Sequence, residues 1–149
     1  MKEFKKQEKQ YIYFRDGGSC TFCGKELQLR QASLDHYLPK SKGGPDAVYN
    51  IVLSCKTCNK LKKSSIPEDY EDVMIRLLKK GVRDKKITGS ALKIRHQELE
   101  ALVAEVDKVE HIGEYTVFQS PRYRFYVKGD KIVRVVQIGS LSKDMGDNS

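Results

Sequence analysis

Residues 20–63, CTFCGKELQLRQASLDHYLPKSKGGPDAVYNIVLSCKTCNKLKK, contain all four cysteines of the chain, in two Cys-x-x-Cys pairs. Each pair, Cys20/Cys23 and Cys55/Cys58, can offer two thiolates from one tight turn to a tetrahedral ion, and zinc is the expected occupant. Four sulfurs fill the coordination sphere, so we expect a structural site. The alternative is buried free thiols or redox motifs, although a redox motif needs only one such pair.

Four polar residues in or beside this stretch's apolar runs attract attention, namely Asp35, His36, Asn50 and Asn59. A carboxylate next to an imidazole combines an oxygen ligand for Mg²⁺ or Mn²⁺ with a group that takes a proton from water near neutral pH. Neighbours on a strand point to opposite faces, so the strand predicted over Leu34–Pro39 must end or distort if both serve one site. Taken singly, a histidine is more often structural, and an asparagine is often a turn or cap residue.

Residues 20–63 as a whole resemble the HNH endonuclease family. The shared features are the paired cysteines, the Asp-His, the Pro, the Gly-Gly, the Asn before an apolar run and Cys-Asn-x-x-Lys. The resemblance implies an α+β fold with a ββα-metal, treble-clef-like core, in which a hairpin and a helix hold a catalytic ion. The activity that it implies is hydrolysis of DNA phosphodiester bonds with one metal ion.

The resemblance also implies roles for single residues. His36 would be the general base, and Asn50 would orient its imidazole or the loop beside it. Asp35 and Asn59 would bind the catalytic Mg²⁺ or Mn²⁺. The family often has histidine where Asn59 stands, and an amide oxygen at that position favours an oxygen-preferring ion.

The chain carries 28 Lys and Arg against 20 Asp and Glu, a formal net charge of +8, which favours a polyanionic partner. We expect double-stranded DNA. Six lysines around the motif are predicted to contact its backbone: Lys40, Lys42, Lys56, Lys60, Lys62 and Lys63. Any one of them is equally consistent with an ordinary solvated surface.

Other functions remain open at this level. A non-catalytic zinc module that binds nucleic acid or protein would use the cysteines and lysines and leave His36 incidental. RNA cleavage, restriction, homing, packaging and defence are not separated by the sequence. No apolar stretch reaches the roughly 20 residues of a membrane span and the N-terminus lacks a signal peptide, so a cytoplasmic location in a bacterial or phage-infected cell is expected.

The chain is predicted to hold a nuclease domain over residues 1–66 and an extension of unknown role over 67–149. Lys2–Phe14 predicts a basic helix that ends at a glycine pair. Helices are predicted over Glu68–Lys80 and Ser90–Glu110, because apolar residues recur there at helical spacing. Cutting both strands of DNA would favour a homodimer, or a larger complex, assembled through the extension.

The tail changes from helical to strand periodicity. Tyr123–Val127 and Lys131–Val136 flank a glycine-containing turn and predict a β-hairpin. Its alternating aromatic and basic residues suit core packing or nucleic-acid contact, and core packing is the commoner case. His96 and His111 are interpreted as structural or surface residues, and residues 140–149 are expected to be disordered.

Overall fold

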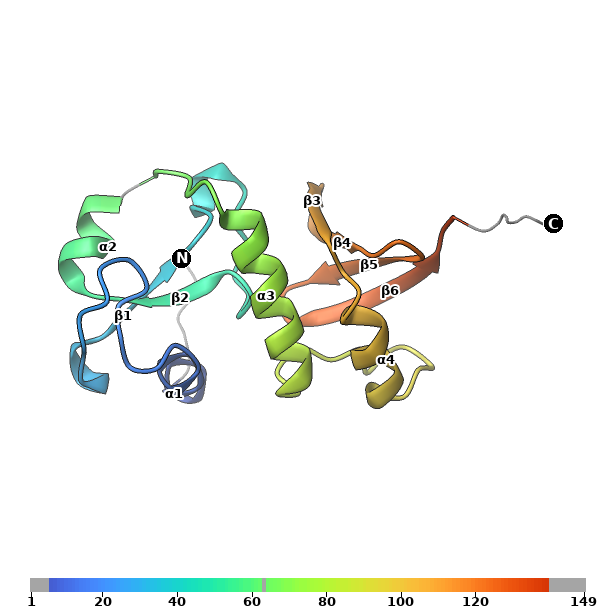
Figure 1. Ribbon diagram of the computed structural model, residues 1–149, viewed down its shortest axis with the longest axis horizontal. Coiled ribbons are helices and arrows are strands. Elements are labelled where there is room, and N and C mark those ends of the chain that lie inside the picture. Colours follow the sequence, from blue (N-terminus) through green and yellow to red (C-terminus); the bar gives the residue numbers. More distant parts are fainter. Residues whose placement is uncertain (1–5, 63, 140–149) are drawn as a thin grey trace. The chain divides into compact units, whose positions relative to one another are not determined.

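The computed structural model describes residues 6–62 and 64–139, and the chain divides into two compact units, one ending at Tyr70 and the other beginning at Glu71. We call them the N-terminal unit and the C-terminal unit. Each combines helix with antiparallel sheet, so the predicted α+β class is confirmed (Figure 1). Within the described ranges, no helix has both the length and the apolar composition that crossing a bilayer requires.

The N-terminal unit contains a short antiparallel pair of strands followed directly by a helix. Strands β1 and β2 pair so that Asp35 lies opposite Val52 and His36 opposite Ile51. The elements, in chain order, are α1 (Lys6–Arg15), η1 (Leu29–Gln31), β1 (Ser33–His36), η2 (Lys40–Lys42), β2 (Ile51–Ser54) and α2 (Lys56–Lys62). Helix α1 packs against β2, and helix α2 packs against β1.

Strand β1 is shorter than the sequence predicts, because it ends at His36 and not at Pro39. Tyr37 still donates its N–H to the carbonyl of Asn50 at 2.8 Å. The N–H of Leu38, however, is bound by the side-chain Oδ1 of Asn50 at 2.9 Å. At Leu38, the side chain of Asn50 thus takes the place of a backbone carbonyl of β2 as the hydrogen-bond acceptor. The strand pairing ends there and the loop begins.

The core of the N-terminal unit includes two of the cysteines. One cluster consists of Ile12, Cys20, Leu27, Ala32, Ile51, Leu53 and Cys55. Other buried apolar residues of the unit are Tyr37, Leu38, Ala47, Val48, Tyr49 and Val52. At the end of α1, the buried guanidinium of Arg15 donates to the carbonyls of Val48 and Ile51. Asp16 accepts the N–H of Leu53 at 2.8 Å. Charged side chains that the sequence analysis did not single out therefore fasten this helix to β2. The helix predicted over Lys2–Phe14 is present from Lys6, and residues 2–5 lie outside the described part.

The C-terminal unit is an antiparallel four-stranded sheet, in the order β3-β4-β5-β6, with two helices. Its elements are α3 (Tyr70–Arg83), α4 (His96–Val103), β3 (Lys108–Ile112), β4 (Tyr115–Gln119), β5 (Tyr123–Lys128) and β6 (Lys131–Gln137). The largest fully buried side chains are Met74, Leu77, Leu78, Ile87, Leu99, Phe118, Phe125 and Ile132. Apolar burial from both helices and three strands therefore supports this unit.

The helix predicted over Ser90–Glu110 is present only as α4, from His96 to Val103, and the prediction is wrong on both sides of it. Residues from Lys108 onward form β3, because a tight turn at Gly113, with φ of +60°, lets this segment pair with β4. Val106 and Val109 are three residues apart, a spacing that fits one face of a helix and not one face of a strand, so apolar spacing favoured the wrong element here. The hairpin expected at 123–136 is present as β5 and β6, but it is half of a larger sheet. The expected disorder of residues 140–149 lies outside the described residues.

Candidate active site and metal centre

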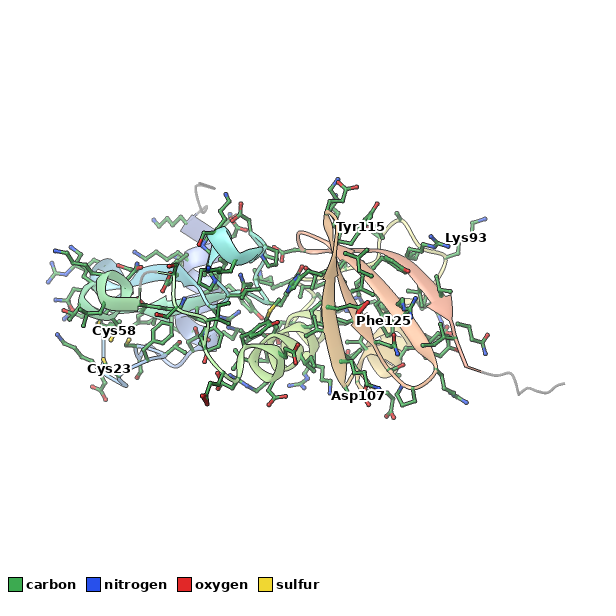
Figure 2. All side chains as sticks on the ribbon, turned by 90° about the horizontal axis from the view of Figure 1, so that it is seen from above. Cys23, Cys58, Lys93, Asp107, Tyr115 and Phe125 are labelled. Atoms are coloured by element: carbon green, nitrogen blue, oxygen red, sulfur yellow. The ribbon has the colours of Figure 1, made fainter. Side chains whose placement is uncertain are left out.

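The four cysteines meet at one point. Their sulfur atoms all lie within 4.8 Å of one another, and the structure holds them as free thiols without a disulfide. Figure 2 shows Cys23 and Cys58, one from each Cys-x-x-Cys turn, at the same place in the N-terminal unit. The first turn closes through the N–H of Gly24 on the carbonyl of Cys20 at 2.9 Å, and Gly24 has a φ of +78° that favours glycine.

The electrostatics of the quartet call for a cation. Burial raises the pKa of the Cys20 thiol, but N–H groups of Cys23, Cys55 and Phe22 that bond to its sulfur lower it more, to about 6. The pKa of Cys58 is raised to about 12, first because its thiol shares a hydrogen bond with Cys55. The bare set can therefore ionise only in part. A dication that binds four thiolates tetrahedrally removes this conflict, so the residues fit a structural zinc ion.

His36 lies at the end of β1 with its ring buried and paired to a carboxylate. Its Nε2 is 2.6 Å from Oδ1 of Asp46, and the second oxygen of Asp46 accepts from Nζ of Lys40 at 3.3 Å. The hydrogen bond from His36 is the main reason why the pKa of Asp46 is below its usual value. A carboxylate in this position orients an imidazole and stabilises its charged form.

Asp46 was not among the residues that the sequence singled out. It stands in the SKGGPD segment, ten residues from His36, where neither helical nor strand periodicity links the two. An aspartate in a glycine-rich loop is an ordinary turn residue. Only the folded loop brings it to the imidazole.

Asn50 is completely buried and holds that loop. Its Oδ1 accepts the N–H of Leu38, and its Nδ2 donates to the carbonyls of Leu38 and Pro45 at 3.0 and 3.1 Å. Gly44 permits the close approach, since a Cβ there would lie 1.8 Å from the carbonyl oxygen of Leu38. Of the two orienting roles implied for Asn50, these bonds correspond to holding the loop that carries Asp46.

Asp35 has a carboxylate oxygen that is unusual in its surroundings. Its Oδ2 is buried and has no hydrogen-bond partner among the described residues. Burial raises the pKa of Asp35, and the charge of Lys62 opposes the rise. An orphaned carboxylate oxygen is costly unless a cation binds it, so this residue fits a ligand of a divalent ion.

Asn59 lies half-buried on α2, the helix that packs against β1 and hence against the strand of Asp35. Its backbone N–H donates to the carbonyl of Cys55 at 3.0 Å. Among the described residues its side-chain amide has no hydrogen-bond partner. The second cysteine turn therefore fixes the backbone of Asn59 and leaves its amide oxygen available.

Lys62 points inward rather than toward a passing phosphate backbone. Its Nζ donates to the carbonyl of His36 at 3.0 Å and lies 5.9 Å from the ring centroid of Phe22. Burial lowers the pKa of Lys62, and the charge of Asp35 counteracts this. Phe22 also stacks on Tyr37, with ring centroids 5.7 Å apart, so the first cysteine turn contacts residues on both sides of the candidate site.

The other lysines predicted to contact DNA are distributed differently. Lys40 is engaged by Asp46, as described above. Lys42, Lys56 and Lys60 are exposed, and Lys63 lies outside the described residues. The structure therefore separates lysines that belong to the site from lysines on the open surface.

The N-terminal unit thus contains four cysteines that could hold a metal ion, a buried histidine paired with a carboxylate, and a second carboxylate with an unpaired oxygen. Residues 20–73, roughly a third of the chain, match the family model described as HNH endonuclease. The resemblance found in residues 20–63 is thus confirmed and extends into α3. No curated protein matches the chain.

Proposed function

We propose that the N-terminal unit is a metal-dependent endonuclease that hydrolyses DNA phosphodiester bonds, with β1, β2 and α2 as its ββα-metal core. The observation that carries the proposal is the 2.6 Å contact between Nε2 of His36 and Asp46, together with the buried, unpaired Oδ2 of Asp35, the preceding residue of β1. The first contact supports proton transfer and the second supports cation binding. The match of residues 20–73 to the endonuclease family supports both.

His36 takes a proton from the attacking water in this proposal. Its ring is held by Asp46, and the positive charge that develops on the imidazole is stabilised by the same carboxylate. Asn50 keeps the Asp46 loop in place through the backbone of Leu38 and Pro45. General-base catalysis typically contributes about 10²- to 10⁴-fold.

Asp35 and Asn59 are the proposed ligands of the divalent ion. Mg²⁺ or Mn²⁺ held there would neutralise charge on the phosphate and on the leaving oxygen. The charge of Lys62 acts on Asp35 and offsets part of its cost when the ion is absent. Both proposed ligands offer oxygen, which suits hard ions better than zinc.

Double-stranded DNA is the proposed substrate. One such site cuts one strand at a time, so cleavage of both strands would require two copies of the chain or two binding events. The C-terminal unit is the proposed place for such an assembly. The zinc of the cysteine quartet is proposed to be structural, because its four sulfurs leave no position for water.

The test is relaxation of supercoiled plasmid by the zinc-loaded chain with added Mg²⁺ or Mn²⁺. Wild type is compared with His36→Ala and with His111→Ala, a matched histidine from the C-terminal unit. We expect His36→Ala to lose about 10²- to 10⁴-fold in rate and His111→Ala to keep its rate. Equal rates for wild type and His36→Ala would refute the general-base role. DNA binding without cutting under any metal would instead indicate a non-catalytic zinc module.

A further inference from the structure

A hollow on the N-terminal unit is lined in part by Cys55 of the cysteine quartet. It has a volume of about 460 Å³, and the cationic side chains that line it are Lys25, Arg30 and Lys56. Gln31 and Thr57 add neutral hydrogen-bonding groups to the lining. Lys25 follows the first cysteine turn and Lys56 lies within the second, so a metal-fixed frame sets their spacing.

No acidic side chain lines this hollow together with the three cations. None of them forms an ion pair within residues 6–62 and 64–139, and Arg30 donates only to the neutral Oε1 of Gln28, at 3.1 Å. Like charges gathered around a concave surface repel one another and raise the local potential for an anion. An anion bound in the hollow would relieve that repulsion.

A neighbouring hollow continues the same surface along α1. It has a volume of about 480 Å³ and is lined by Lys6, Lys9 and Arg30 together with neutral residues. Arg30 lines both hollows, so the two adjoin the same residue. The exposed surface of this hollow is mostly apolar, and its charges are those of its lysines and of Arg30. Cations spaced along two hollows suit a ligand that presents negative charges repeatedly, whereas a single small anion would occupy only one of them.

We propose that Lys25, Arg30 and Lys56, continued by Lys6 and Lys9, form a basic track that binds the phosphodiester backbone of DNA. The proposal rests on the proposed nuclease function. It names a surface that binds the DNA substrate with residues other than the proposed catalytic ones. Backbone contacts of this kind position the duplex and contribute affinity without reading sequence. Lys25 and Arg30 were not among the residues selected from the sequence for DNA binding.

One competing role for the track can be separated by experiment. A zinc ion with four thiolates carries a net charge of minus two, and Cys55 lines the same hollow as the three cations. Lysines there could serve only to balance that charge. In that case their removal would weaken zinc binding and leave DNA affinity unchanged.

The experiment measures fluorescence anisotropy of a labelled duplex of about 20 base pairs with the zinc-loaded full chain, in a His36→Ala background that prevents cutting. The test variant carries Lys25→Gln, Arg30→Gln and Lys56→Gln. The matched control carries Lys93→Gln, Lys108→Gln and Lys131→Gln, three exposed lysines of the C-terminal unit, and removes the same amount of charge.

We expect the track variant to bind DNA about 10²-fold more weakly at 0.1 M salt, with a salt dependence shallower by about 0.9 for each phosphate that it no longer neutralises. The control should change little, and zinc affinity should be unaffected in both. Equal weakening of DNA binding in the two variants, or a change confined to zinc affinity, would overturn the track. Cutting of plasmid by the wild-type chain is scored separately. If the wild-type chain cuts plasmid but the track variant binds DNA as tightly as its parent, only the basic track is refuted. If the track variant binds DNA more weakly but the wild-type chain does not cut plasmid, only the nuclease function is refuted.

Discussion

The two units reach stability by different means. The N-terminal unit buries a histidine, an asparagine and two thiols among its apolar side chains. The C-terminal unit buries large apolar residues from two helices and three strands, with Thr116 and Ser120 as its buried polar residues. A core that includes thiols able to bind a metal ion is expected to depend on that ion, whereas an apolar core is not. The proposed catalytic groups thus lie in the unit whose stability is expected to depend on a metal.

Removing the zinc ligand Cys58 is expected to have the largest effect. Cys58→Ser leaves three thiolates and should unfold the N-terminal unit, since structural zinc contributes on the order of 10 kcal/mol to small domains. Amide exchange by NMR should show reduced protection in β1 and β2 and retained protection in β4 and β5. Retained protection in both sheets would mean that the N-terminal unit does not depend on the metal.

The converse experiment targets the apolar core. Phe118 is fully buried, so Phe118→Ala should destabilise the C-terminal unit by about 3–5 kcal/mol in a denaturant titration. Zinc affinity should be unchanged, because the quartet lies in the other unit. Val133→Ala, at a side chain that is 39% exposed, is the control and should cost little. A large drop in zinc affinity with Phe118→Ala would show that the units do not fold independently.

The two asparagines of the candidate site should behave differently. Asn50→Ala leaves buried backbone groups of Leu38 and Pro45 unpaired and should cost about 1–3 kcal/mol for each unsatisfied group. Asn59→Ala removes an amide without a hydrogen-bond partner in the described structure, so stability should hold. Mn²⁺ binding, followed by electron paramagnetic resonance, should weaken for Asn59→Ala. Equal stabilities for the two variants would contradict the loop-holding role of Asn50.

The smallest expected effect concerns pH and the C-terminal unit. Burial lowers the pKa of His111, whose Nε2 has no hydrogen-bond partner in the described part, while Glu71 opposes the shift. The unfolded chain, with an ordinary pKa near 6.5, takes up a proton first as pH falls. The free energy of unfolding should therefore decrease below about pH 6.5 and be constant above it. His111→Gln should flatten this dependence in thermal melts, and an unchanged slope would contradict the assignment.

The cysteine quartet could be predicted from the sequence because a metal ion brings its ligands together whatever the intervening chain does. Asp35 and His36 could also be selected from the sequence, because they are adjacent residues and the covalent chain keeps them close together. Asp46 could not be predicted, since its contact with His36 depends on a loop that Asn50 and Gly44 hold. That geometry has no periodic signature.

Two further differences have similar physical reasons. Lys62 was expected on the DNA surface, but its direction follows from how α2 packs on β1, which composition does not encode. The segment from Lys108 was expected to be helical, because its apolar spacing is that of a helix, and only pairing with β4 makes it a strand. Local patterns therefore identified the chemistry, and tertiary contacts decided its arrangement.

The most direct test of the account is chemical rescue of the general base. Single-turnover nicking of plasmid is measured for His36→Ala and for Asp35→Asn, each with zinc loaded, Mn²⁺ present and free imidazole added. We predict that imidazole restores much of the rate of His36→Ala and none of the rate of Asp35→Asn, because it replaces a proton acceptor and not a metal ligand. Nicking by His36→Ala at the wild-type rate without imidazole would contradict the account.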